Sequence, residues 1–294
     1  MLNPLCVENQ QMPVANTEVD PQQQLVDARF HYEASEWSNI YEQHGVTADI
    51  YRLRRDRALA MIEQVGFLDA NTLEIGCGAG LLSVALAQRG CRVEATDRLD
   101  AMIHLTRDLA GKKGVSDRIT ARICDAHALP FPDDSFDTAI AVGVLPWLHS
   151  PEEALREIAR VLRDGGHLVI TVDNRWPLTL LFDPFCSPVT EPIRRWARKL
   201  LESLGLVKRR QKPRLRPYST RQLDELLDRA GLQKISWTTI GFGPFVFLKC
   251  ELMPDSIATY AHTKLQWLAD RRVPFIRSTG IEYIALAEKR ISVA

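Results

Sequence analysis

Short apolar runs alternate with helix-forming stretches between residues 71 and 173, and this alternation constrains the fold more than any other feature of the chain. Strand–helix–strand units joined by short links form a parallel sheet with helices on both faces, so we expect a doubly wound α/β fold. Because the crossovers are right-handed, the carboxyl ends of the strands meet at one edge, where such sheets bind ligands. The expected strands are 71–76, 91–97, 118–126, 136–144, 167–173, 232–243 and 280–289, and the expected helices are 80–90, 100–111, 150–166 and 219–231.

The segments around this core differ from it in composition. Residues 1–24 are polar and rich in Gln, Asn and Pro, which predicts a loose arm before a single domain over 25–294. Residues 25–66 show helical spacing of apolar side chains and are expected to form a helical lid. The ligand-binding core is expected at 70–173. Two segments interrupt the pattern and are interpreted as insertions over the ligand end of the sheet, at 174–217 and 244–279.

Charge and cysteine content exclude several classes of protein. The formal net charge is zero, so no global field favours nucleic acid. The 6 cysteines are scattered without metal-binding or C-x-x-C spacing, which indicates a reduced, cytoplasmic protein and no metal site. No apolar run is long enough for a transmembrane helix, and the N-terminus has no basic segment followed by an apolar core, so we expect no signal peptide.

The sequence LEIGCGAG at residues 73–80 places three glycines in a strand-to-helix turn. Glycines gather there when the backbone takes positive φ or approaches a ligand, although tight packing alone also explains them. The spacing G-x-G-x-G differs from the G-x-G-x-x-G of dinucleotide sites, and no Lys-Ser or Lys-Thr follows as in a P-loop. Glu74 precedes the first glycine by two residues and suits a positively charged ligand better than a pyrophosphate.

Two more carboxylates end the next two expected strands. Asp97 stands where doubly wound folds bind ribose hydroxyls, although it would also serve as a helix cap. Asp125 and Ala126 end the third strand, where a carboxylate can accept a hydrogen bond from an adenine amino group. The three acidic positions together favour a nucleoside ligand with vicinal hydroxyls, an amino-bearing base and a cationic centre.

On these residues the chain resembles the class I S-adenosylmethionine-dependent methyltransferases. It looks most like the branch with the ubiquinone- and menaquinone-biosynthesis methyltransferases (methyltransferase type 11). The similarity spans residues 70–173, with weaker agreement at 219–243 and 280–289. It rests on LEIGCGAG (73–80), VEATDRLDAM (93–102), CDAHALPFPDDSFDTAIAVGVLPWL (124–148) and EEALREIARVLRDGGHLVIT (152–171).

The resemblance implies a Rossmann-like sheet of seven strands with an antiparallel last strand, and S-adenosyl-L-methionine as the cofactor. Glu74, Gly76 and Gly78 would lie along the methionine part of the cofactor, with Cys77 filling the turn and the backbone of Gly143 nearby. Asp97 would bind the ribose. The adenine would be surrounded by Arg98, Met102, Asp125 and Ala126. The family often closes an N-terminal aromatic side chain over the cofactor, which we assign to Tyr32 among Phe30, Tyr32, Trp37 and Tyr41.

Methyl transfer from a sulfonium is an in-line displacement that mainly requires alignment of the acceptor and exclusion of water. A hydroxyl, amine or carbon acid acceptor also needs a base. His149 follows the fourth strand at the ligand end and is the candidate, although a surface position before a helix cap would also explain it. His31 and His127 are weaker candidates.

Residues 194–216 hold ten Lys or Arg, after an apolar and aromatic stretch that begins at Trp176. Three interpretations stay open: a solvated basic face, an anion site for the acceptor, or a peripheral membrane contact through 176–216. The aromatic stretch 240–249 would line an apolar acceptor pocket or form a buried strand end.

We therefore expect methyl transfer to a hydrophobic, lipid-like or anionic small molecule. A quinone, tetrapyrrole or isoprenoid-phosphate precursor is an alternative acceptor, and a cofactor-binding relative without methyl transfer is an alternative function. The sequence VGVLPW after the fourth strand lacks the Asn-Pro-Pro-Tyr-like motif of amino-methylating enzymes, so a nucleic acid or protein substrate is disfavoured.

Overall fold

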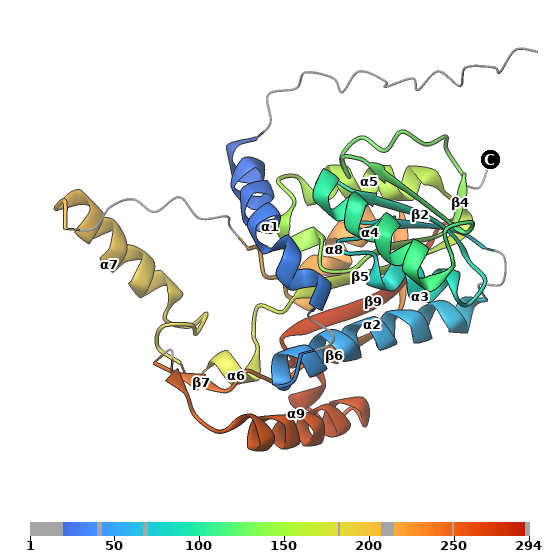
Figure 1. Ribbon diagram of the computed structural model, residues 1–294. Coiled ribbons are helices and arrows are strands. Elements are labelled where there is room, and N and C mark those ends of the chain that lie inside the picture. Colours follow the sequence, from blue (N-terminus) through green and yellow to red (C-terminus); the bar gives the residue numbers. More distant parts are fainter. Residues whose placement is uncertain are drawn as a thin grey trace, which may run out of the picture.

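A seven-stranded sheet with the strand order β3-β2-β1-β4-β5-β9-β6 runs through the molecule (Figure 1). The computed structural model describes residues 20–39, 43–66, 70–181, 183–206, 215–248 and 250–291. The strands of this sheet are β1 (Asn71–Ile75), β2 (Arg92–Asp97), β3 (Ile119–Ile123), β4 (Phe136–Ala141), β5 (Leu162–Asp173), β6 (Leu232–Ile240) and β9 (Glu282–Lys289). The longer helices are α1 (Pro21–Asn39), α2 (Val46–Val65), α3 (Leu81–Ala87), α4 (Asp100–Lys113), α5 (Pro151–Val161), α7 (Glu191–Ser203), α8 (Thr220–Arg229) and α9 (Asp255–Asp270).

The directions of the strands confirm the expected fold class. Strands β1 to β5 pair in parallel, whereas the last strand, β9, is antiparallel to both of its neighbours, β5 and β6. The long apolar run in β4 is buried on both faces, as expected for a central parallel strand. This arrangement brings the carboxyl ends of β1 to β5 to one edge of the sheet.

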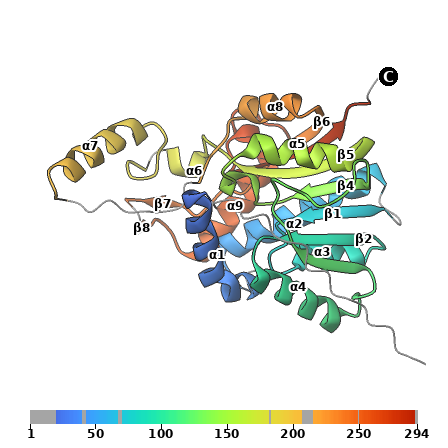
Figure 2. The same ribbon diagram turned by 90° about the horizontal axis from the view of Figure 1, so that it is seen from above.

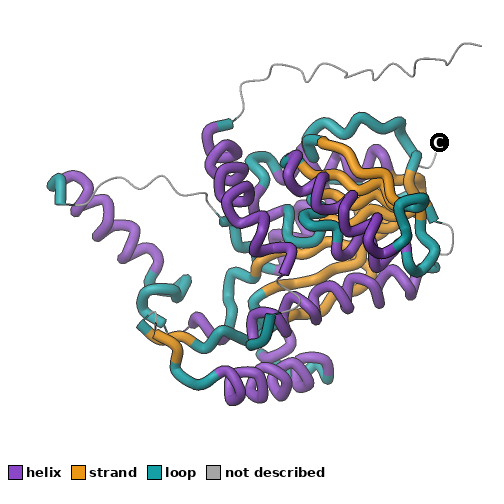
Figure 3. Tube along the Cα trace, viewed as in Figure 1, coloured by secondary structure: helices purple, strands orange, loops and turns teal. Residues whose placement is uncertain are grey.

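Helices cover both faces of the sheet and form two apolar cores (Figures 2 and 3). Helices α2, α3 and α4 pack on one face, where Ile62, Leu86 and Ile103 are almost fully buried. Helices α5 and α8 pack on the other face around Leu155, Ile158 and Leu227. With both faces covered, the edge at the carboxyl ends of the parallel strands is where a fold of this type binds a ligand.

The structure shifts several expected boundaries, and two of these shifts are large. The helix expected at 150–166 ends at Val161, because Leu162 takes an extended conformation and pairs with Phe136 of β4. At the N-terminal side, residues 21–24 belong to α1 and Gln23 is buried, so the part of the expected arm that the structure describes is helical. The helical region expected at 25–66 contains the helices α1 and α2. Gly45, with φ of 109°, directly precedes α2.

The two expected insertions have different positions. The first contains α6 (Leu178–Leu181) and α7, and α7 extends away from the sheet (Figures 1 and 2). The second contains β7 (Val246–Phe247), β8 (Cys250–Glu251), α9 and the short helix η2 (Ile276–Ser278). Helix α9 packs beside α2, with Arg57 of α2 paired to Asp270.

Two sequence interpretations concerned these outer segments. In the aromatic stretch 240–249, Ile240 ends β6 and Phe242 is fully buried, whereas Phe247 and Leu248 are exposed. No described residue of this stretch lines the main cavity, so the structure does not support it as the acceptor pocket. No helix in the described ranges combines the length and the apolarity that crossing a membrane would require.

Candidate functional site

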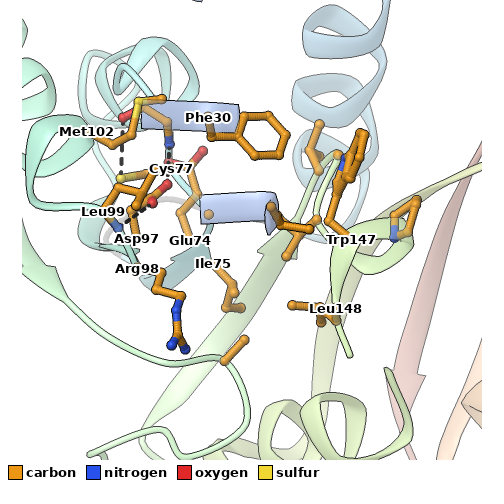
Figure 4. A pocket seen from close by; sticks show the side chains of 18 of the residues that line it. Phe30, Glu74, Ile75, Cys77, Asp97, Arg98, Leu99, Met102, Trp147 and Leu148 are labelled. Atoms are coloured by element: carbon orange, nitrogen blue, oxygen red, sulfur yellow. Dashed lines mark hydrogen bonds between the residues drawn. The ribbon is translucent and has the colours of Figure 1, made fainter. Parts of the chain in front are cut away.

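A cavity of about 290 Å³ lies at the carboxyl ends of β1, β2, β4 and β5. Helix α1 contributes Val26, Asp27 and Phe30 to its wall, so the N-terminal helix closes over the edge of the sheet. In Figure 4, Asp97 and Met102 lie on one side of the cavity and Trp147 on the other, with the ring of Phe30 between α1 and the sheet. The ring of Phe30 meets that of Trp147 edge to face, with 5.2 Å between the centroids.

The glycine turn between β1 and α3 is held by the strand beside it. Gly76, Gly78 and Gly80 have positive φ, a conformation that other residues rarely adopt. The amide of Gly78 donates to Asp97 Oδ2 at 3.0 Å, and the amide of Leu99 donates to Asp97 Oδ1 at 3.0 Å. Asp97 therefore fixes the turn while its carboxylate lines the cavity.

A second group of charges surrounds the end of β3. Arg98 donates to Asp27 of α1 at 2.8 Å and also binds Asp125. His127 Nδ1 lies 2.6 Å from the other oxygen of Asp125, and the amide of Ser150 donates to His127 Nε2. Burial opposes ionisation of Asp125, but the hydrogen bonds from His127 and the charge of Arg98 hold its pKa below the usual range. Asp125 is thus an ionised acceptor at the cavity wall.

Glu74 is the most deeply buried carboxyl of the cavity. Burial raises the pKa of Glu74 to about 8; the hydrogen bond from Ser83 opposes this shift, and the charge of Asp97 adds to it. A cation placed in the cavity would favour the ionised form of Glu74. The site is therefore prepared to release a proton when a positively charged ligand enters.

The pKa of Glu74 predicts how stability depends on pH. Because the folded carboxyl binds a proton up to about pH 8 and the unfolded one only up to about 4.5, the free energy of unfolding falls as pH rises across this window. We expect the Glu74→Gln variant to lose this component, on the order of a few kcal/mol between pH 5 and pH 8.5. Urea denaturation at several pH values measures it. Glu63→Gln, at an exposed carboxylate of α2, is the control; equal slopes for the wild type and Glu74→Gln would contradict the shift.

The cavity brings together ten of the eleven predicted cofactor-binding residues. These ten are Glu74, Gly76, Cys77, Gly78, Asp97, Arg98, Met102, Asp125, Ala126 and Gly143. The eleventh, Tyr32, is 85% exposed and does not line the cavity, whereas Phe30 does. The assignment of Tyr32 is therefore corrected, because Phe30 is the aromatic residue of α1 that lines the cavity. The side chain of Trp37 and residue Tyr41 lie outside the described residues.

His149, the predicted base, does not line this cavity. It faces a separate, polar surface pocket with Arg216 and Tyr218. Its ring stacks on that of His127 with 3.7 Å between centroids, and burial together with the neighbouring His127 lowers its pKa. The assignment of His149 as the base for a ligand in the main cavity is corrected, because the loop after η1 (Leu145–Trp147) turns the side chain away.

The sequence of the chain matches known methyltransferases over the part that forms much of this cavity. Residues 73–170 match the family described as "Methyltransferase domain". Residues 73–170 are thus similar to a methyltransferase domain. It is 35% identical over 123 residues to Methyltransferase GfsG of Streptomyces halstedii, a match that covers 39% of this chain and 44% of that protein. It is 29% identical over 155 residues to a ubiquinone biosynthesis O-methyltransferase of Aeromonas salmonicida, covering 52% of this chain and 63% of that protein.

A solved structure shows how far the fold is shared. The crystal structure of the cyclase SpnF matches with a TM-score of 0.59 at 20% identity, covering 92% of this chain and 97% of that chain. This likeness shows the fold of the methyltransferase domain together with its flanking segments. The chain spans less than two thirds of the length of these two sequence relatives.

Three charged residues at the far end of the cavity were missed by sequence reasoning. Asp173 ends β5, Glu282 begins β9, and Arg54 reaches them from α2; all three line the same cavity as the glycine turn of the methyltransferase domain. Asp173 was detectable, because it ends a strand as Asp97 and Asp125 do. No sequence pattern around Glu282 or Arg54 indicated a site, since both reach the cavity only through long-range packing.

Proposed function

We propose that the protein transfers a methyl group from S-adenosylmethionine to a hydrophobic small molecule. The observation that carries this proposal is the single cavity that joins the glycine turn and its carboxylates to an apolar, aromatic wall. The first part suits a cationic nucleoside, and the second suits an apolar acceptor. Both would be held beneath α1, which limits access of water.

The residues present fit this cofactor. A methyl group added at Gly78 would meet no atom within 4 Å, so the turn leaves open space on its cavity side. Asp97 would accept hydrogen bonds from the ribose hydroxyls, and Asp125 one from the adenine amino group. Met102 is buried and offers an apolar surface to the base. When bound, the cofactor would supply an activated methyl group; the chain's own residues would hold and orient it.

The acceptor side of the cavity is mostly apolar. Pro146, Trp147 and Leu148 contribute from the segment after β4, and Leu215 from the end of the first insertion. Such a wall favours a ring or an aliphatic chain over a charged metabolite. The relative from Aeromonas salmonicida is named for ubiquinone biosynthesis, which supports a quinone-type precursor among the alternatives. Tetrapyrrole and isoprenoid-phosphate precursors remain alternative acceptors to be tested.

The test of the proposed function has two arms. Calorimetry with S-adenosylhomocysteine should show one site per chain, and absence of binding by folded protein would overturn the proposal. Methyl-labelled S-adenosylmethionine incubated with a small-molecule extract should then yield a labelled product that partitions into organic solvent. Binding without transfer would favour the alternative of a cofactor-binding relative, and the match to a cyclase shows that this fold occurs with other chemistry.

We also propose that α7 is a peripheral contact for anionic lipid. Ile193, Trp196 and Leu200 recur at helical spacing and are exposed, Ile193 and Trp196 by 69% and 66%. Arg194, Arg195, Arg198 and Lys199 occupy the intervening positions of the helix. On the polar side, Glu191 and Glu202 pair with Arg195 and Arg198, while Arg194 and Lys199 add further positive charge. A helix with one apolar face and a polar face of net positive charge suits the surface of an anionic membrane.

Vesicle sedimentation tests the proposed lipid contact. We expect the wild type to bind vesicles that contain phosphatidylglycerol and to be released by high salt, because the basic side chains supply part of the attraction. The variant Trp196→Glu should bind at least roughly tenfold more weakly, since it removes the largest apolar anchor. Trp267→Glu, at an exposed tryptophan of α9, is the matched control. Equal binding by the two variants would argue against α7 as the contact.

A further inference from the structure

Two carboxylates face each other at the end of the cavity farthest from the adenine side. Asp173 of β5 and Glu282 of β9 are direct partners in the antiparallel register. Residues paired in this way have side chains on the same face of the sheet, with Cβ atoms about 5 Å apart. Both side chains line the cavity, as does that of Thr171, two residues before Asp173 on the same face. The strand pairing thus forces two acidic groups together.

One cation balances this pair among the described residues. Arg54 of α2 donates to Glu282 Oε1 at 3.2 Å, and its guanidinium lies over the ring of Tyr51, 4.5 Å from the centroid. Glu282 is 7% exposed, and its Oε2 is buried without a hydrogen-bond partner in the described part of the chain. No side chain in the described ranges donates a hydrogen bond to the carboxylate of Asp173. Two acids and one base leave an excess acidic group at the cavity wall.

This environment changes the titration of Asp173. Burial raises the pKa of Asp173 to about 7, the charge of Glu282 adds to the shift, and the charge of Arg54 opposes it. From α2, Tyr51 and Arg55 line the same cavity, and Arg54 is the α2 residue whose charge acts on Asp173. A carboxyl with a pKa near the working pH is suited to accept a proton and to return it to water.

The acidic pair lies next to the expected position of the methionine part of the cofactor. The amide of Gly143 donates to Thr171 Oγ1 at 2.7 Å, which ties the end of β4 to the strand that carries Asp173. Arg54 Nη1 would be 3.1 Å from a Cβ placed on Gly143. Arg54 therefore lies beside both Glu282 and Gly143, so the acidic pair and the predicted methionine end are neighbours in one cavity.

We propose that Asp173 is the proton acceptor for a hydroxyl-bearing substrate, with Glu282 and Arg54 as its positioning residues. This inference rests on the proposed methyl transfer. The hydroxyl proton moves to a carboxylate oxygen of Asp173, and the electron pair on the substrate oxygen forms the bond to the methyl carbon. The bond between that carbon and sulfur breaks, and its electrons stay on sulfur. Asp173 then releases the proton to solvent.

The same geometry selects the chemical class of the acceptor. An acidic wall repels a carboxylate or phosphate at the reacting end and accepts a hydrogen bond from a phenol or alcohol. The apolar residues Trp147 and Leu148 would hold the remainder of such a molecule. The inference therefore narrows the acceptor to a hydrophobic phenol or alcohol whose reacting end carries no negative charge.

The central test is the variant Asp173→Asn. We expect its affinity for S-adenosylhomocysteine to stay within about threefold of the wild type, while transfer of label to the extract falls by at least roughly 100-fold. The wild-type rate should rise with pH through about 7, and Asp173→Asn should lack this rise. In Glu282→Gln the rise should move to lower pH, because loss of the neighbouring charge lowers the pKa of Asp173.

Two controls separate the base from a structural or cofactor-anchoring role. Glu288 lies on β9 outside the cavity, so the variant Glu288→Gln should change neither the rate of methyl transfer nor its pH profile. Carbon-13 NMR of labelled aspartate follows the carboxyl of Asp173 directly, and titration near 4 would overturn the inference without any activity assay. Parallel loss of S-adenosylhomocysteine affinity and transfer in Asp173→Asn would show cofactor anchoring instead. If the wild-type protein binds S-adenosylhomocysteine but transfers no label, the proposed methyl transfer itself is wrong.

Discussion

Replacement of Asp97 by alanine is expected to weaken binding of S-adenosylhomocysteine by at least roughly 100-fold, because two charge-assisted hydrogen bonds to the ribose would be lost. The loss has a second component. Asp97 also accepts the amides of Gly78 and Leu99, so its removal releases the glycine turn from β2. Isothermal titration calorimetry measures the affinity, and the melting temperature shows whether the fold is kept.

Two further variants sharpen this prediction. Asp97→Asn keeps the shape and one oxygen but removes the charge, and should give an intermediate loss. Asp100→Asn changes an exposed carboxylate three residues later, at the start of α4, and should bind as the wild type does. If Asp97→Ala binds normally, the carboxylate serves only to hold the amides of Gly78 and Leu99, a structural role like the helix cap that the sequence left as an alternative.

Alanine substitutions at the glycines of the turn should differ sharply in how much they lower the free energy of unfolding. A Cβ on Gly80 would lie 2.8 Å from the backbone Cα of buried Thr106, in a residue with φ of 77°. Thr106 cannot move away without breaking its hydrogen bond to the carbonyl of Gly78. We expect Gly80→Ala to lower the free energy of unfolding by about 3 kcal/mol, from overpacking added to a strained backbone. Chemical denaturation measures it.

Alanine substitutions at Gly114 and Gly78 separate the cost of overpacking from the cost of a strained backbone. Gly114 ends α4 with φ of 69° and has no atom within 4 Å of the Cβ position, so Gly114→Ala should show the backbone cost alone, about 1 kcal/mol. Gly78→Ala should cost a similar amount in stability and also weaken cofactor binding, since its methyl group would enter the cavity. Equal stability losses at Gly80 and Gly114 would argue against the close packing described for Thr106.

Local signals predicted the strands and the cofactor side of the site. Asp97 and Asp125 each end a strand, and parallel strands bring their carboxyl ends together whatever the rest of the chain does. Which side of α1 faces the cavity was harder to predict. Phe30 and Tyr32 are two residues apart on α1, a rotation of about 200°, so when one faces the cavity the other faces solvent.

Long-range packing explains what the sequence missed. Glu282 meets Asp173 only because β9 inserts between β5 and β6, a pairing that no local pattern encodes. Arg54 is one of four arginines between residues 52 and 57, and only the packing of α2 selects it for contact with Glu282. His149 lies close to the ligand edge in sequence, but in the fold it lines a separate pocket and only contacts His127, which does line the cavity.

Arg98 holds the first helix and the adenine end of the cavity with one guanidinium, since it binds Asp27 of α1 and Asp125 after β3 at the same time. We expect a ligand that binds Asp125 to weaken its pair with Arg98 and to leave the pair between Arg98 and Asp27 as the remaining link to α1. Because the ion pairs are partly exposed, ionic strength should alter the rate of exchange more than the final affinity.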